Sequence, residues 1–106
     1  MQSSELLDFV VEKIDDMKGR DVVKLDVQKK STITDYMVVC SGNSKRHVQS
    51  IGESVYLEAK NSGIKIIGME GKQFGEWVLV DLGGVIVHVM QESTRDFYQL
   101  EKLWAE

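Results

Sequence analysis

The segment from Ser41 to His47, Ser-Gly-Asn-Ser-Lys-Arg-His, carries the residues best suited to hold a small anion. It follows an apolar run and precedes a helical pattern, so its backbone N–H groups would lie at a helix N-terminus, where phosphate groups bind readily. One hypothesis is therefore a nucleotide-binding or nucleotidyltransferase-like enzyme that uses Gly42, Ser44, Arg46 and His47. A glycine turn followed by a serine helix cap explains the same residues structurally, and the spacing matches neither a Walker loop nor a Rossmann fingerprint.

Other catalytic chemistry finds little support in the sequence. A nucleotidyltransferase needs two carboxylates alternating on a strand after such a turn to hold Mg²⁺, but the next acids, Glu53 and Glu58, fall within a helical pattern. One cysteine and two histidines cannot supply a usual zinc site, and no Gly-x-Ser-x-Gly elbow offers an activated serine. We therefore expect no enzyme, no cofactor and no metal.

The clearest structural signal is the segment from Trp77 to Met90. Two runs rich in Val, Ile and Leu flank Gly83 and Gly84, which predicts a β-hairpin with a two-residue turn. In that register one face is wholly aliphatic and belongs to the core; it carries Val78, Val80, Leu82, Val85, Val87 and Val89. The opposite face is mixed and carries Trp77, Leu79, Asp81, Ile86, His88 and Met90. Such a mixture suits either a recognition surface or a position beneath a helix.

Net charge indicates the kind of partner that this face would take. The chain has 13 basic and 17 acidic residues, a formal charge of −4, which disfavours nucleic acid as the main ligand and favours a basic protein. Trp77 is either a core indole under the last helix or a partly exposed anchor, since tryptophan is a frequent interface hot spot. Asp81 is either a turn residue or an acceptor for a partner's Lys or Arg.

The remaining pattern predicts one α/β domain of 106 residues with the element order αββαβββα and a mixed sheet of about five strands. Strands are expected over 21–27, 35–41 and 64–69 besides the hairpin, with a right-handed crossover joining the parallel second and third strands. The first helix is expected over 1–18 with Ser3 or Ser4 as its cap. The second is expected over 44–61, with Ser44 as its cap and Gly63 as its stop. The third is expected to begin at a Ser93 cap, with Asp96 completing a capping box. The last helix would bury a stripe of Phe97, Leu100, Leu103 and Trp104.

Cysteine usage and hydropathy bear on location. Cys40 follows Val38 and Val39, so we expect a buried, inert thiol, which fits a reducing compartment. No apolar run approaches the roughly 20 residues that a membrane span needs, and the acidic N-terminal region is unlike a signal peptide. We expect a soluble cytoplasmic protein.

Four segments occur in one order: Asp35-Tyr-Met-Val-Val-Cys-Ser-Gly-Asn-Ser-Lys-Arg-His-Val48, Trp77-Val-Leu-Val-Asp-Leu-Gly83, Val85-Ile-Val-His-Val-Met90 and Tyr98-Gln-Leu-Glu-Lys-Leu-Trp104. Together they resemble the ribosomal silencing factor family, also called Iojap. The resemblance runs from Leu6 to Trp104, and four matches at the right separations make it specific. The family's pattern usually has Asp after the hairpin glycine, where this chain has Gly84, so any contact assigned to that carboxylate is lost.

The resemblance implies a nucleotidyltransferase-like α/β fold used without catalysis. It also implies binding to the large ribosomal subunit through its fourteenth protein, with a minor contact to ribosomal RNA. Because that site lies where the small subunit docks, its occupation would prevent subunit joining and repress translation when nutrients are short. A further role in large-subunit biogenesis is left open.

Matching positions imply a partner-binding surface on the mixed face and its surroundings, made of Trp77, Asp81, Leu82, His88 and Met90, with Asp35, Met37 and Glu70 adjoining. Trp77 and Met90 would supply apolar area, and the acids would meet basic groups. Leu82 lies on the core face in the predicted register and would reach a partner only from the hairpin tip. A third hypothesis is a self-associating scaffold whose hairpin face pairs in a homodimer, which is compatible with silencing if that face is released for the ribosome.

Overall fold

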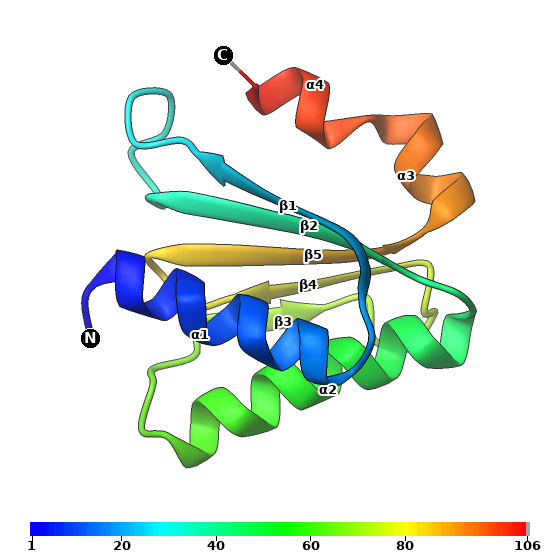
Figure 1. Cartoon of the computed structure of the whole chain (residues 1–106), viewed down its shortest axis with the longest axis horizontal. Coiled ribbons are helices and arrows are strands. Elements are labelled where there is room, and N and C mark those ends of the chain that lie inside the picture. Colours follow the sequence, from blue (N-terminus) through cyan, green and yellow to red (C-terminus); the bar gives the residue numbers. More distant parts are fainter. Residues whose placement is uncertain (106) are drawn as a thin grey trace.

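A five-stranded mixed sheet forms the centre of the computed structural model, which describes residues 1–105 (Figure 1). Its strands, in the spatial order β1-β2-β5-β4-β3, are β1 (Arg20–Asp26), β2 (Tyr36–Gly42), β5 (Val85–Gln91), β4 (Trp77–Asp81) and β3 (Gly68–Glu70). Only β2 and β5 pair in parallel; the other neighbours are antiparallel. The predicted α/β class and five-stranded mixed sheet are confirmed.

Helices α1 (Ser3–Asp16) and α2 (Lys45–Asn61) cover one face of the sheet (Figure 1). Their buried stripes, which include Val10, Ile14, Ile51 and Val55, pack against the aliphatic face of the sheet in one core cluster. The two short helices α3 (Glu92–Tyr98) and α4 (Leu100–Trp104) lie on the other side, over part of β1, β2 and β5. The chain thus leaves β2 toward one face and β5 toward the other.

The hairpin has the predicted register. Val78 pairs with Val89, Val80 pairs with Val87, and the N–H of Leu82 donates to the carbonyl of Val85 at 2.9 Å across the Gly-Gly turn. All six residues of the predicted aliphatic face are buried. The turn therefore closes with glycine at position 84, as expected.

The first two helices follow the predicted pattern with one correction at a cap. The α1 helix is preceded by Gln2, whose N–H donates to the Glu5 carboxylate at 3.2 Å, so Ser3 and Ser4 lie inside the first turn and do not cap it. The α2 helix is capped by Ser44, as predicted, and the chain turns at Gly63 with a φ of +75°.

The predicted last helix is wrong in its start, continuity and buried stripe. It begins at Glu92 after Gln91 and not at a Ser93 cap, and Gln99, with a φ of +49°, divides it into α3 and α4. A left-handed residue changes the direction of the chain, so side chains before and after it no longer share one helical face. Leu100 is buried, whereas Phe97 is 79% exposed and Leu103 is 71% exposed.

The predicted third strand is also shorter than expected. Regular pairing begins only at Gly68, and residues 64–67 precede the strand. The pairings make β3 run in the same direction as β2, as predicted, but β5 and β4 stand between them. The crossover through α2 therefore spans the width of the sheet.

Two observations concern the sequence-based expectations of a buried thiol and of no membrane-spanning segment. Cys40 is a free, fully buried cysteine, and burial raises the pKa of its thiol to about 12, so it stays protonated and unreactive. Within residues 1–105, no helix has the length and apolar character needed to cross a lipid bilayer.

We expect two glycine substitutions to separate backbone strain from steric overlap. Gly63 (φ +75°) and Gly71 (φ +84°) both have left-handed backbones, but a Cβ at Gly63 meets open space, whereas one at Gly71 overlaps the Trp77 carbonyl oxygen. Gly63→Ala should lower the free energy of unfolding by about 1 kcal/mol, and Gly71→Ala should lower it by clearly more because β4 must shift. Urea unfolding followed by circular dichroism measures both, and equal losses would contradict the expectation.

Candidate functional site

The mixed face of the hairpin is divided by α3 and α4 into a covered part and an open part. In the covered part, Met90 and Val39 form a second buried cluster with Leu100 of α4. In the open part, Trp77, Leu79, Asp81 and Ile86 are each partly exposed, and exposed Glu70 joins them because it pairs with Leu79 across β3 and β4. We call these five residues the open sheet face.

The structure brings together only some of the residues predicted to bind a partner. Trp77, Asp81 and Glu70 belong to the open sheet face, but Met37, Leu82, His88 and Met90 are buried. Leu82 lies in the main core, as its register requires. The expectation that Met90 supplies surface area does not hold in this structure, because the cluster under α4 takes up its side chain fully.

Asp35 does not adjoin the open sheet face. Its carboxylate accepts a hydrogen bond of 2.6 Å from the hydroxyl of Ser3, which belongs to α1 on the opposite side of the sheet. The backbone N–H groups of Asp35 and Tyr36 both donate to the Gly84 carbonyl at 3.1 Å. Asp35 therefore ties α1 and the start of β2 to the hairpin turn.

Trp77 packs against neighbouring rings and is also partly exposed. Its ring centroid lies 4.9 Å from that of Tyr98 and 5.8 Å from that of His88, and its indole N–H donates to His88 Nδ1 at 3.0 Å. It packs on the second buried cluster but stays partly exposed. The indole thus joins the buried and the open parts of the mixed face.

His88 is a neutral, buried partner of this indole. Because Nδ1 accepts the hydrogen bond, the ring proton lies on Nε2, which is buried with no hydrogen-bond partner among residues 1–105. Burial lowers the pKa of His88 from 6.5 to about 4. The imidazole therefore carries no charge near neutral pH and positions Trp77.

Asp81 serves the hairpin turn. Its Oδ1 accepts from the N–H of Gly83 at 2.9 Å, which is the turn role, one of the two alternatives that the sequence left open. The residue is partly exposed, so its carboxylate borders the solvent beside Ile86, with which it pairs across the hairpin. A turn residue at this position also places negative charge at one end of the open sheet face.

Several polar groups of the segment from Ser41 to His47 are used in hydrogen bonds within the protein. The hydroxyl of Ser44 accepts from the N–H of His47 at 3.0 Å. The ring of His47 accepts from the N–H of Asn43 at 2.9 Å and lies 2.8 Å, through Nε2, from the Met17 carbonyl at the end of α1.

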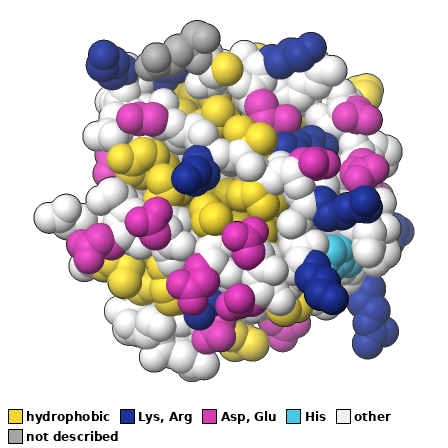
Figure 2. Space-filling view, viewed as in Figure 1, with side chains coloured by type: hydrophobic (Ala, Val, Ile, Leu, Met, Phe, Trp, Pro, Cys, Tyr) yellow, Lys and Arg dark blue, Asp and Glu magenta, His cyan; other side chains and the backbone are white. Residues whose placement is uncertain are grey.

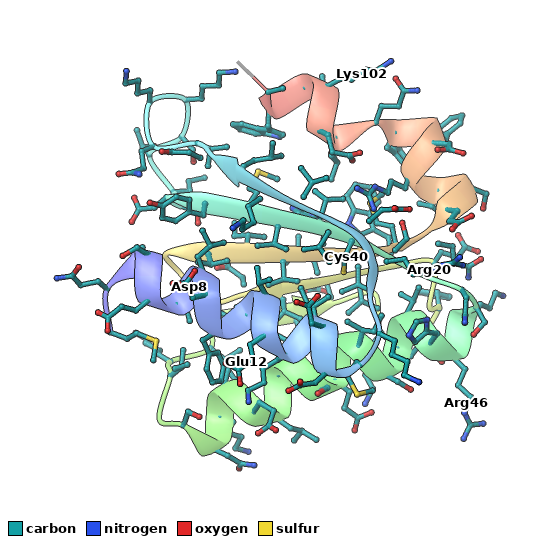
Figure 3. The ribbon with its side chains drawn as sticks, viewed as in Figure 1. Asp8, Glu12, Arg20, Cys40, Arg46 and Lys102 are labelled. Carbon is teal, nitrogen blue, oxygen red and sulfur yellow. The ribbon has the colours of Figure 1, made fainter. Side chains whose placement is uncertain are left out.

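The other residues of this segment give no sign of a ligand. A Cβ at Gly42 would lie 2.8 Å from the backbone nitrogen of Val48, so close packing explains this glycine. Arg46 is exposed and points away from the protein (Figure 3). Among the described residues, no group of three or more His, Cys, Asp or Glu side chains could hold a metal ion.

Arg95 is a structural residue that the sequence reasoning missed. It is buried, donates from Nη1 to the hydroxyl of Ser41 at 2.9 Å, and donates from Nε to Glu101 at 3.2 Å. These bonds join α3 to β2 and α4, so they hold both helices over the covered part of the mixed face. No local signal distinguishes such an arginine from a solvated one, because its partner Ser41 is distant in sequence.

The opposite face of the sheet is covered by α1 and α2 (Figure 1). Figure 2 shows the α1–α2 side, where acidic, basic and apolar side chains are interspersed. Asp8 and Glu12 are exposed on α1 (Figure 3). The open sheet face lies on the other side of the sheet.

Comparison with known proteins gives similarity over the whole chain. A model of the family described as "Ribosomal silencing factor during starvation" matches residues 1–106. The chain is 47% identical over 100 residues to "Ribosomal silencing factor RsfS" from Haemophilus influenzae, a match that covers 94% of this chain and 98% of that relative. It superimposes on a crystal structure of a protein from Chromobacterium violaceum with a TM-score of 0.96 and 41% identity, covering 98% of this chain and 87% of the other.

A more distant relative from Mus musculus, "Mitochondrial assembly of ribosomal large subunit protein 1", is 33% identical over 101 residues. This match covers 92% of the present chain and 44% of the mouse protein. The similarity thus extends to a protein named for the ribosomal large subunit.

We expect His88 to make stability depend on pH below neutrality. Because its pKa is about 4 in the folded chain and 6.5 in the reference state, the unfolded chain binds a proton that the folded chain does not. The contribution of neutral His88 to the free energy of unfolding is fully present above pH 6.5. It is lost as the pH falls toward 4, and the total loss is roughly 3 kcal/mol. His88→Gln removes this titration, so the free energy of unfolding, measured in urea at several pH values, should fall less steeply with acid in the variant. If the free energy of unfolding fell equally steeply with acid in the wild type and the variant, His88 would not be held neutral in the folded chain.

Proposed function

Since the chain belongs to the ribosomal silencing factor family, we propose that it represses translation by binding the large ribosomal subunit and preventing its union with the small one. The observation that carries this proposal is the family match over residues 1–106. The contact would be made to the fourteenth protein of the large subunit, at the face where the small subunit docks. The relative named for the ribosomal large subunit supports this choice of particle.

The open sheet face is the surface that we assign to this contact. It offers partly exposed apolar side chains at its centre, Trp77, Leu79 and Ile86, and carboxylates at its edge, Glu70 and Asp81. Interfaces commonly combine an apolar centre with a polar rim. Carboxylates would complement a basic ribosomal protein and favour the correct orientation of encounter.

Silencing of this kind requires no turnover. The chain has a mass of 12.0 kDa and extents of 33 × 32 × 20 Å, so a bound copy at the docking face would exclude the other subunit by volume. We accordingly assign no catalytic residue, cofactor or metal, and we place the action in the cytoplasm, where the subunits meet. The structural roles of Ser44 and His47 support this over a nucleotide-binding enzyme.

Charge reversal on the open sheet face should weaken binding without unfolding the protein. Glu70 is exposed, so Glu70→Lys should leave the thermal midpoint nearly unchanged but place like charge against a basic partner. We expect affinity for isolated large subunits, measured by pelleting, to fall roughly tenfold. Glu12→Lys is the matched control, because it makes the same charge change on exposed α1. Equal losses in both variants would assign the effect to net charge and contradict a local contact.

Binding should also compete with subunit joining. When purified large and small subunits are mixed, added protein should reduce the joined particles seen in sucrose gradients, in proportion to the large subunits occupied. Glu70→Lys should require more protein for the same reduction, in the ratio of the two affinities. Binding that leaves joining unchanged would contradict the steric mechanism.

A further inference from the structure

Three aromatic side chains form a row that leads from the sheet onto α3. The ring of Tyr98 lies 4.9 Å from that of Trp77 and 4.9 Å from that of Phe97, the second pair at an interplanar angle of 84°. Exposure increases along the row, because Trp77 is partly buried, Tyr98 is 49% exposed and Phe97 is 79% exposed. We call Trp77, Tyr98 and Phe97 the aromatic row.

We propose that the aromatic row extends the partner-binding surface beyond the open sheet face, with Phe97 as an anchor that enters an apolar socket on a basic protein. This inference rests on the proposed function, since it assigns further residues to the same contact. It concerns α3, whose Phe97 and Tyr98 carry no role in the surface described above.

Phe97 contacts the ring of Tyr98 but belongs to neither buried cluster of residues 1–105, and its side chain is 79% exposed. The left-handed backbone at Gln99 separates α3 from α4, and Leu100 alone among the expected apolar stripe is buried. A contiguous exposed apolar patch is uncommon on a soluble domain and often marks an interaction site. Aromatic residues are among those enriched at interface hot spots.

Continuity with the open sheet face strengthens the assignment. Trp77 belongs to both groups, so a partner that covers the indole from the sheet side meets Tyr98 next, and Phe97 beyond it. The row is also held firmly at its inner end, because Trp77 donates to buried His88 at 3.0 Å. Trp77, which is positioned in this way, loses little conformational entropy on binding.

The charges around the row favour a basic occupant. Asp96 precedes Phe97 and Glu76 precedes Trp77 in the sequence, and both of these acidic side chains are exposed. The nearest cation in α3, Arg95, is buried and paired with Glu101 at 3.2 Å, so it does not offset these carboxylates at the surface. An apolar anchor among carboxylates fits a socket rimmed by Lys or Arg better than a second copy of this acidic chain.

Substitutions at Phe97 test the anchor with isolated large ribosomal subunits as the probe. Phe97→Ser should weaken pelleting with large subunits roughly tenfold or more, while Phe97→Leu, which keeps apolar volume, should stay close to the wild type. The thermal midpoint should be unchanged in both, because the ring is mostly exposed. Leu57→Ser is the matched control, since Leu57 is 45% exposed on α2, in the helical layer on the opposite face.

The outcomes separate this inference from the proposed function. If Phe97→Ser binds like the wild type while Glu70→Lys binds weakly, the anchor is overturned and the proposed function stands. If Phe97→Ser abolishes a homodimer seen by light scattering but leaves large-subunit binding intact, the row is a self-association surface and the inference also fails. If the wild-type protein does not pellet with large subunits, both proposals fail together.

Discussion

The single register of the β4–β5 hairpin is the constraint on which the rest of the structure depends. Side chains alternate between the faces of a strand, so pairing Val80 with Val87 sends every valine of the hairpin toward α1 and α2. The same pairing sends Trp77, His88 and Asp81 to the other face. A shift of one residue would expose the core and bury the acid, so the stability of the domain and the composition of its recognition surface are fixed by one choice.

On the second face, α3 and α4 cover one part, which is buried, and leave the part to which we assign partner binding exposed. The bonds from Arg95 to Ser41 and Glu101 hold these helices over Met90 and Val39, which would otherwise be exposed. The ion pair is partly desolvated. Arg95 is fixed by its second bond to Ser41, whereas Glu101 Oε1 is buried with no hydrogen-bond partner among residues 1–105, so the pair contributes more to a defined geometry than to stability. The rest of the face stays open because the two helices are short.

Much of this fold could be predicted from local patterns. The hairpin register follows from alternating valines around two glycines, and the α2 cap follows from the chemistry of Ser44 with the neighbouring N–H groups. The break at Gln99 could not be predicted, because neither glycine nor proline marks it, and the buried stripe expected beyond it was wrong for that reason.

The candidate site was harder to predict than the fold, because burial on the mixed face depends on contacts between distant segments. Met90 and His88 look like surface residues in a hairpin considered alone. Met90 becomes a core residue because Leu100 of α4 packs with it, and His88 is buried with Trp77 against it. Asp35 adjoins the hairpin in the sheet, yet its carboxylate turns to Ser3 of α1. Residues that share a strand register therefore need not share a surface.

Under the proposed function, the partial cover lets an acidic domain present exposed aromatic rings to a partner. Trp77 is oriented by a neutral imidazole, and its exposed edge continues into Tyr98 and Phe97, so the apolar area is ordered before any partner arrives. The exposed carboxylates of Asp96 on α3 and Glu70 on β3 would attract a basic surface and disfavour a second acidic copy. In the proposed contact, shape and charge would select the same class of partner, and blocking a docking site would require no catalytic step.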